Sequence, residues 1–266
     1  MRWELMTSPA LGKAARDLGV CVLGLGVLER HSEHLPLGTD YLNVHRICCL
    51  AAEREPAVVF PPFYFGQIYE ARCFPGAVTL RPTLLLDLLQ SVLDEIGRNG
   101  FQKIILQNGH GGNNGLNQFL VQSALWEQKP YTLYLHSPRR TPESAARRAE
   151  ILDPALGGHA GASETSVTLA NVPEGVDSDA VPQHEGETLG RLDHLSDGFT
   201  ALNWYANYPE HYQGVAAAGT AEAGRALVEM SVEGLARFIA AAKADTVAPG
   251  LQDEFFGREA GLRDGS

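Results

Sequence analysis

The sequence of 266 residues predicts an α/β fold, a three-layer α/β/α sandwich with a mostly parallel central sheet. Short apolar runs typical of buried strands alternate along the chain with segments of helical periodicity. This alternation favours parallel strands that are covered by helices on both faces. The length suits one or two domains, and we expect residues 1–266 to form a single one. In such a fold, functional residues belong in the loops at the carboxyl ends of the strands.

Four apolar stretches are the expected strands: residues 20–28, 57–60, 103–106 and 131–135. The first follows Arg16 and Asp17 and lacks a small-residue cleavage site, so it is a poor signal peptide. It is also much shorter than the roughly 20 residues that a membrane-spanning helix needs. We therefore interpret it as a buried core strand.

Five segments are the expected helices: residues 40–54, 82–97, 112–127, 163–170 and 220–243. Pro82 suits the first turn of the second helix, where its missing N–H costs little. Apolar residues then recur at steps of three to four residues, and they do so again in the fifth segment. These two apolar stripes are Leu85, Leu89, Val92 and Ile96, and Val228, Val232, Leu235 and Ile239.

The charge balance argues against two classes of partner. Lys and Arg number 21 and Asp and Glu number 32, which gives a net charge of −11. Such an acidic chain is unsuited to nucleic acid or anionic membranes as main partners. The four cysteines form no C-x-x-C motif, a pattern typical of reduced thiols in a cytoplasmic protein.

A cluster of possible metal ligands follows the first strand, in the stretch GVLERHSEHLPLGTD at residues 26–40. Glu29 and His31 are two residues apart, so in an extended segment their side chains point to the same side. Asp40 lies at the start of the next helix. Glu, His and Asp together suit a divalent transition metal such as Zn or Mn. The simpler alternative is a charged surface loop.

Two further loops carry histidines. His110 stands in NGHGGNN after the third strand, where no Walker pattern follows the glycines, and a capped turn is the simpler alternative. His159 precedes Glu164 by five residues in HAGASETS, and a turn at Gly161 could bring the two together. Taken alone, His159 and Glu164 give a weak signal.

The stretch from residue 173 to residue 219 has little periodicity but is rich in histidine, tryptophan and tyrosine. Irregular segments of this length are usually functional or form an interface. The aromatic content argues against disorder, which is the alternative. Within it, His211 in YPEHYQG is the histidine that we would test for substrate contact.

The three clusters in this order resemble the creatininase (creatinine amidohydrolase) family. The matching pieces are residues 29–31, 34–40, 108–113 and 159–166, and FPGAVTL at 74–80 and residues 215–224 also look like family segments. The resemblance extends from about Gly24 to Ala242. It implies an α/β/α fold and a metal-dependent hydrolase, often with two metals and often a hexamer.

The resemblance also implies roles for single residues. Glu29 and His110 would hold one metal, His31 would hold the other, and Asp40 would bridge the two. His159 would be the catalytic or substrate-orienting histidine.

The sequence departs from creatininase itself at two places. Gly111 and Gly112 stand where creatininase has a bulky residue and a metal-ligating glutamate, and residues 155–156 lack its Trp-Asp pair. Glu164 is our hypothesis for the substitute ligand, or else for the base that acts on the attacking water. These departures argue against creatinine as the substrate.

The predicted function is hydrolysis of a C–N bond in a small cyclic amide or formamide by a metal-activated water, with one or two ions of Zn, Mn or Fe. One alternative is C–C hydrolysis of a cyclic diketone of inositol breakdown, as in 3-dehydro-scyllo-inosose hydrolase. The other alternative is a non-enzymatic α/β protein that binds a small molecule. We expect a cytoplasmic homo-oligomer, with a hexamer as the family form.

Overall fold

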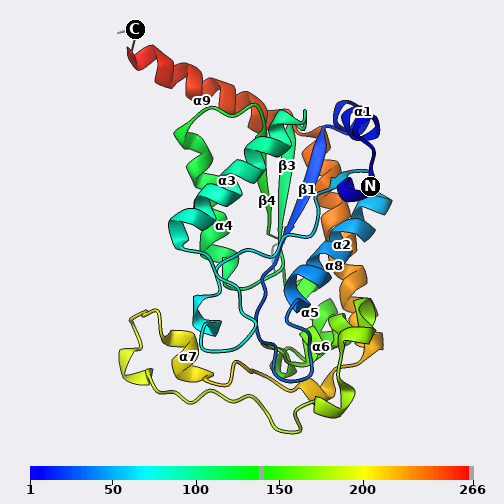
Figure 1. Cartoon of the computed structure of the whole chain (residues 1–266), viewed down its shortest axis with the longest axis vertical. Coiled ribbons are helices and arrows are strands. Elements are labelled where there is room, and N and C mark those ends of the chain that lie inside the picture. The colour runs from blue at the N-terminus through cyan, green and yellow to red at the C-terminus, as the bar shows by residue number, and fades with distance from the viewer. Residues whose placement is uncertain (138–140, 264–266) are drawn as a thin grey trace.

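The computed structural model describes residues 1–137 and 141–263. A parallel four-stranded sheet lies at its centre, in the order β2-β1-β3-β4 (Figure 1). The strands are β1 (Val20–Leu25), β2 (Val58–Val59), β3 (Lys103–Asn108) and β4 (Thr132–His136). All four expected strands are present, but β1 ends at Leu25, three residues before the expected end.

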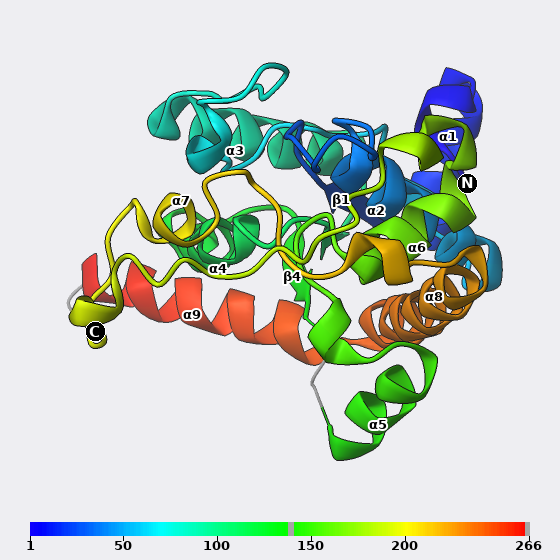
Figure 2. The ribbon, with the colours of Figure 1, turned by 90° about the horizontal axis from the view of Figure 1, so that it is seen from below.

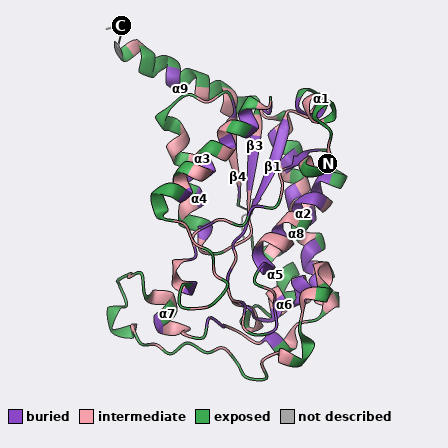
Figure 3. Ribbon diagram, viewed as in Figure 1, coloured by how far each residue is buried: buried purple, intermediate pink, exposed green. Residues whose placement is uncertain are grey.

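Helices cover both faces of the sheet. On one face α1 (Ser8–Leu18), α3 (Pro82–Arg98) and α4 (Asn113–Ser123) pack on Leu23, Ile104 and other buried strand residues. On the other face α2 (Thr39–Arg54) and α8 (Ala221–Ala244) pack on Val22 and Ile105, and α6 (Ala162–Asn171) packs on α8. Figure 3 shows β1 and β3 buried between these layers. The predicted three-layer fold class is confirmed.

The expected helices form for the reasons read from their sequences. Pro82 is the first residue of α3, and the Thr220 hydroxyl caps α8 by accepting the Ala223 N–H at 3.1 Å. The apolar stripe of α8 is buried against the sheet layer. Burial of one apolar stripe is the main source of stability for such helices.

Three helices were not expected: α1, α5 (Pro142–Ile151) and α9 (Val247–Arg263). Figure 2 shows α5 standing out from the body beside α8, to which the Arg147–Glu233 ion pair links it at 2.8 Å. The shorter pieces are α7 (Asn203–Asn207) and the 3-10 turns Trp3–Leu5, Tyr69–Ala71, Ala124–Trp126, Pro154–Leu156, Pro173–Gly175, Ser178–Ala180, Asp193–Leu195 and Ala216–Ala218. None of the helices among the described residues is long and apolar enough to span a membrane.

The sheet order creates a topological switch point at the carboxyl ends of β1 and β3. The chain runs from β1 outward to β2 and then returns past β1 to β3, so the connections leave these two neighbours in opposite directions. Their last residues, Leu25 and Asn108, are register partners, and the Gly109 N–H donates to the Leu25 carbonyl at 2.8 Å. Ligands of open α/β sheets bind at such switch points. The segment 173–219 runs past this same end of the sheet (Figure 1).

Contact between α6 and α8 depends on Gly224, and this gives a first prediction. A Cβ at Gly224 would lie 1.8 Å from the Ser166 carbonyl oxygen of α6, whereas a Cβ at Gly234 on the same helix would meet nothing within 4 Å. We expect Gly224→Ala to lower the free energy of unfolding by about 1–3 kcal/mol, because the helices must separate. Gly234→Ala should be neutral or stabilise by up to about 1 kcal/mol. Urea unfolding of both variants measures this, and equal stability of the two would contradict it.

Candidate metal centre

Three side chains from different elements meet above the switch point. His110, in the loop after β3, places Nδ1 2.8 Å from Glu29 Oε1 and 2.9 Å from Asp40 Oδ2. Glu29 follows β1, and Asp40 is the second residue of α2. The two carboxylates are buried, and all three ligand-type atoms lie within 4.8 Å of one another. Glu29, Asp40 and His110 therefore form one group that could hold an ion.

A second group shares Asp40. His31 Nε2 lies 3.3 Å from Asp40 Oδ1 and 3.6 Å from Glu164 Oε2, and Glu164 stands in the first turn of α6. Asp40 thus presents Oδ2 to the first group and Oδ1 to the second. The structure brings together every side chain that the sequence singled out for the site: Glu29, His31, Asp40, His110, His159 and Glu164. Their roles as ligands stay a prediction.

Several of these atoms lack the partners that buried polar atoms normally have. Among the described residues, no hydrogen bond is made by Glu29 Oε1, His31 Nε2 or Asp40 Oδ2, although all three are buried. Buried polar atoms without partners are rare, because the lost hydration is not replaced. A cation between these atoms would satisfy all of them at once. The donor set, carboxylate oxygen and imidazole nitrogen, fits a divalent transition metal.

Backbone carbonyls fix which imidazole nitrogens face the group. His31 Nδ1 lies 3.3 Å from the Glu29 carbonyl oxygen, and His110 Nε2 lies 3.0 Å from the Gln67 carbonyl oxygen. A carbonyl only accepts, so these nitrogens carry the protons. The lone pairs of His31 Nε2 and His110 Nδ1 then point at the carboxylates. Hydrogen bonds of this kind orient metal-ligating histidines. Gln67 carries no sequence signal, because only its backbone takes part.

The field at the centre is strongly negative. Burial alone would lower the pKa of His31, but the carboxylates of Asp40, Glu29 and Glu164 outweigh burial and raise that pKa to about 10. Burial would also lower the pKa of His110, but the carboxylates of Glu29 and Asp40 outweigh burial and raise that pKa well above its ordinary value. A divalent ion bound between these groups would offset this negative field.

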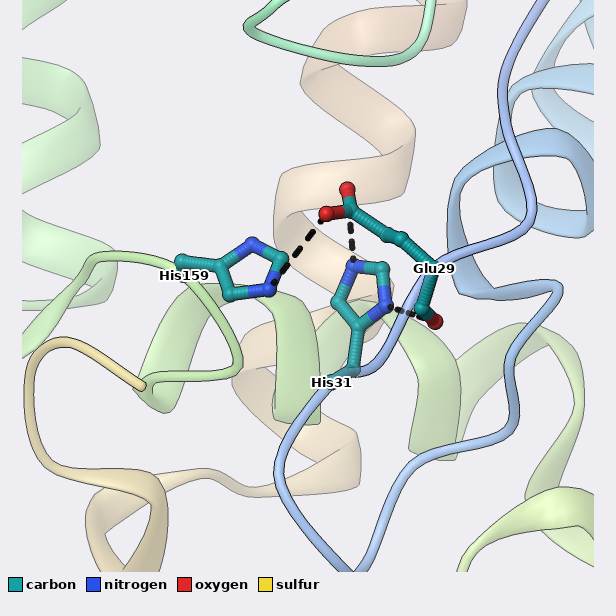
Figure 4. Close-up of side chains that lie close together, drawn as sticks. All are labelled: Glu29, His31 and His159. Atoms are coloured by element: carbon teal, nitrogen blue, oxygen red, sulfur yellow. Dashed lines mark hydrogen bonds and ion pairs between the residues drawn. The ribbon is translucent and has the colours of Figure 1, made fainter. Parts of the chain in front are cut away.

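His159 lies beside the Glu29 carboxylate. Figure 4 shows His31 and His159 both directed toward the Glu29 carboxylate, with His159 Nε2 3.8 Å from Glu29 Oε2. His159 Nε2 also lies 2.8 Å from the Arg30 carbonyl oxygen and so carries the proton. Burial, together with His31, lowers the pKa of His159 to about 3. The free lone pair is on Nδ1, which lies 3.9 Å from Glu164 Oε2.

The Glu164 carboxylate contacts both a backbone donor and the second ligand group. Its Oε2 accepts the Ala160 N–H at 2.6 Å, so the carboxylate does satisfy a backbone donor near the helix start. The same oxygen faces His31 Nε2 in the second group. Burial raises the pKa of Glu164 to about 7, against the opposite effect of His31. At 35% exposure its side chain is the most accessible of the cluster.

His211 reaches the centre from the segment 173–219. Its Nε2 lies 2.6 Å from Glu29 Oε2, and its Nδ1 accepts the Trp204 indole N–H at 3.0 Å. The sequence marked His211 only as a substrate contact to be tested, and no local motif linked it to Glu29. His34 is also buried, but it bonds the Thr165 hydroxyl at 2.8 Å.

Comparison with known proteins gives the family. Residues 4–239 match the family model described as "Creatininase: Creatinine amidohydrolase". The chain belongs to the creatininase family. The resemblance found in the sequence is confirmed, and the chain is a hydrolase of this family rather than a non-enzymatic binding protein.

Three relatives name different activities. Creatinine amidohydrolase of Pseudomonas putida is 28% identical over 66% of this chain and 74% of its own length. 3-dehydro-scyllo-inosose hydrolase of Thermotoga maritima is 24% identical over 89% of this chain and 82% of its own. Mycofactocin precursor peptide peptidase of Mycolicibacterium smegmatis is 32% identical over 58% of this chain and 59% of its own. The family alone therefore does not fix the substrate.

Solved creatininase structures share the fold. A glutamate-to-glutamine mutant creatininase of Zn-Zn type has a TM-score of 0.78 and 24% identity, and covers 92% of this chain and 98% of its own. A manganese form of creatininase has a TM-score of 0.71 and 23% identity, and covers 92% of this chain and 99% of its own.

The two glycines after His110 are not equivalent. A Cβ at Gly112 would lie 2.5 Å from His110 Nε2 and 2.4 Å from Gln67 Oε1, whereas a Cβ at Gly111 would meet nothing within 4 Å. The bond between His110 and Gln67 therefore leaves no room for a side chain at Gly112. The position for which the resemblance implies a metal-ligating glutamate cannot hold a side chain in this chain unless His110 and Gln67 move.

This difference gives a second prediction. We expect Gly112→Ala to push the His110 ring away from the Gln67 carbonyl and to weaken metal binding by about 10–100-fold, as the loss of an orienting hydrogen bond does. Gly111→Ala should leave metal binding unchanged. The affinity of both variants for the metal ion is measured by isothermal titration calorimetry. Equal affinities for the two variants would show that the orientation of His110 does not depend on Gly112.

Proposed function

We propose that this creatininase-family chain hydrolyses the C–N bond of a small cyclic amide or formamide at a centre of one or two divalent ions. The observation that carries the proposal is the position of Asp40, whose two oxygens face two separate groups of possible ligands. A bridging carboxylate of this kind is suited to two ions at hydrolase spacing. The unpartnered buried atoms of Glu29, His31 and Asp40 support it as well.

The residues divide between two ion positions. Glu29, Asp40 and His110 would hold one ion, and His31, Asp40 and Glu164 would hold the other. The Zn-Zn and manganese forms of creatininase support Zn or Mn, and Fe remains in the predicted set. When bound, such an ion lowers the pKa of a water toward about 7 and polarises a carbonyl oxygen.

His159 and Glu164 are the two proposed catalytic residues. His159 offers the Nδ1 lone pair toward Glu164, while Nε2–H donates to the Arg30 carbonyl and fixes the ring. The low pKa of His159 keeps this ring neutral, so the Nδ1 lone pair can orient the attacking water or the substrate by accepting a hydrogen bond from it. Glu164 is a ligand in this scheme, and its alternative role is the base on the attacking water.

A pocket beside Asp40 and Glu164 supports a small substrate. It has a volume of about 280 Å³ and opens beside Asp40 and Glu164. Its lining includes the hydrogen-bonding side chains of Asn43, Gln107, Asn108, Arg148 and Ser163. The glycines at 111 and 112 and the Ala155–Leu156 pair argue against creatinine itself.

C–C hydrolysis of a cyclic diketone is the second candidate function. The Thermotoga maritima inosose hydrolase matches 89% of this chain, and the hydrogen-bonding side chains in the small pocket would also suit a polyol ring. The two functions share the metal centre and differ in the bond that is broken. Substrate assays decide between them.

The remaining expectations also stay proposals. The continuous family match over residues 4–239 supports a single creatininase-like domain over 1–266 that includes the irregular segment 173–219. Exposed apolar side chains on α9, such as Leu251 and Leu262, support a homo-oligomer, for which we expect a hexamer. The cytoplasmic location stays a prediction.

Metal analysis and substrate assays test the proposed function. We expect the purified wild-type protein to hold one or two ions of Zn, Mn or Fe per chain. Inductively coupled plasma mass spectrometry measures this content. Asp40→Asn should lose most of the metal because both groups need this carboxylate, and His110→Ala should lose the ion of the first group. Hydrolysis of cyclic amides, formamides and a cyclic diketone should fall to background in both.

His194→Ala is the matched control, because His194 lies on the exposed part of the segment 173–219. Its metal content and activity should equal those of the wild type. A wild-type chain without metal, together with an unchanged melting temperature in His110→Ala, would defeat the proposal. Cleavage of the diketone alone would establish the second candidate.

Glu164→Gln separates the two roles of Glu164. If Glu164 is a ligand, as we expect, the variant loses the ion of the second group, because an amide is a poorer ligand than a carboxylate. If Glu164 is only the base, the variant keeps full metal content and loses turnover. Metal stoichiometry and kcat, measured on the same preparation, distinguish these outcomes.

A further inference from the structure

The two oxygens of Glu29 have different surroundings. Oε1 faces His110 Nδ1 at 2.8 Å inside the first ligand group, and no hydrogen bond among the described residues satisfies it. Oε2 is 2.6 Å from His211 Nε2. One oxygen is therefore open to an ion while the other is held by a buried ring. The only role predicted for His211 from the sequence is contact with the substrate.

The hydrogen-bond partners of His211 determine its tautomer. The indole Nε1–H of Trp204 can only donate, and it lies 3.0 Å from His211 Nδ1. Nδ1 must accept, so the proton of the neutral ring is on Nε2 and points at Glu29 Oε2. Without the indole N–H, the proton could move to Nδ1, and a lone pair would then face a carboxylate.

The backbone of His211 adopts an unfavourable conformation. Its φ of 53° lies in the left-handed region, which is uncommon for a residue other than glycine. Such a conformation persists only where its surroundings fix it. Here the His211 N–H donates to the Tyr208 carbonyl at 3.0 Å, at the end of α7, and the buried ring bonds Glu29 and Trp204.

Trp204 also faces a larger cleft. Its ring lies 5.6 Å from the ring of His159, between centroids, and 4.8 Å from that of Tyr208. Trp204 lines a cleft of about 790 Å³ together with Gln67, Tyr205 and Tyr208. Two hydrogen bonds, from Trp204 to His211 and from His211 to Glu29, connect this cleft to the metal centre.

We propose that His211 is a positioning residue for the metal ligand Glu29, and that Trp204 sets the tautomer which lets it act. His211 holds Oε2, so Glu29 offers the ion Oε1 alone and in a fixed orientation. The inference rests on the proposed function, because it requires Glu29 to be a ligand. Hydrogen bonds to ligating carboxylates commonly tune metal affinity in this way.

Cobalt(II) titration of four variants tests the inference. His211→Ala removes the hydrogen bond to Glu29, and we expect Co²⁺ affinity to fall by about 10–100-fold with a changed visible absorption spectrum. His211→Gln should recover most of the affinity, because its amide N–H₂ can donate to Oε2. Trp204→Phe keeps an aromatic wall but removes the indole N–H, and it should give an intermediate loss. Trp126→Phe, at a side chain that is 90% exposed, is the control and should match the wild type.

Kinetics on the active substrate add a second readout. We expect kcat to fall in His211→Ala and to return in His211→Gln, whereas Trp204→Phe should change KM as well, because Trp204 lines the cleft. Unchanged Co²⁺ affinity, spectrum and kcat in His211→Ala would overturn the inference. If His211→Ala does not fold, the comparison of Trp204→Phe with Trp126→Phe tests the inference instead. Identical Co²⁺ affinity and spectrum in these two variants would overturn the inference. A wild-type chain that binds no metal defeats the proposed function instead, so the two failures are distinguishable.

Discussion

The parallel pairing of β1 with β3 is the contact on which the candidate site depends. Because Leu25 and Asn108 are register partners, the loops that follow them start side by side at the point where the chain connections diverge. A slip of one residue would turn each following side chain to the opposite face of the sheet. The two buried helix layers fix this register by burying alternate residues of β1 on opposite faces.

The candidate ligands include several carboxylates that lie close together in a largely buried space. Such a grouping needs hydrogen bonds that fix the surrounding side chains. An outer set of contacts supplies them: the carbonyls of Glu29, Arg30 and Gln67 each accept from a site imidazole. The acceptors in these bonds are all backbone atoms, which the fold places accurately. The centre is therefore a rigid arrangement in which the open lone pairs all face inward, and this arrangement suits a cation better than any neutral ligand.

The sequence predicts most of the frame and most of the centre. The strands and the two amphipathic helices α3 and α8 follow from local periodicity, and the candidate ligands follow from short motifs near strand ends. The spacing of Leu11, Ala14, Ala15 and Leu18 is a helical signal for α1, whereas α9 has little amphipathic character. The bond between His211 and Glu29 joins residues 182 positions apart, and no local pattern reports such a contact.

The order of the ligands along the chain has a consequence for biosynthesis. Glu29, His31 and Asp40 leave the ribosome early, but Glu164 and His211 follow only after most of the chain has been made. During that interval the hydrogen bond between His211 and Glu29 cannot form. The candidate centre is therefore complete only after residues up to His211 have been made, so the site assembles late in the synthesis of the chain.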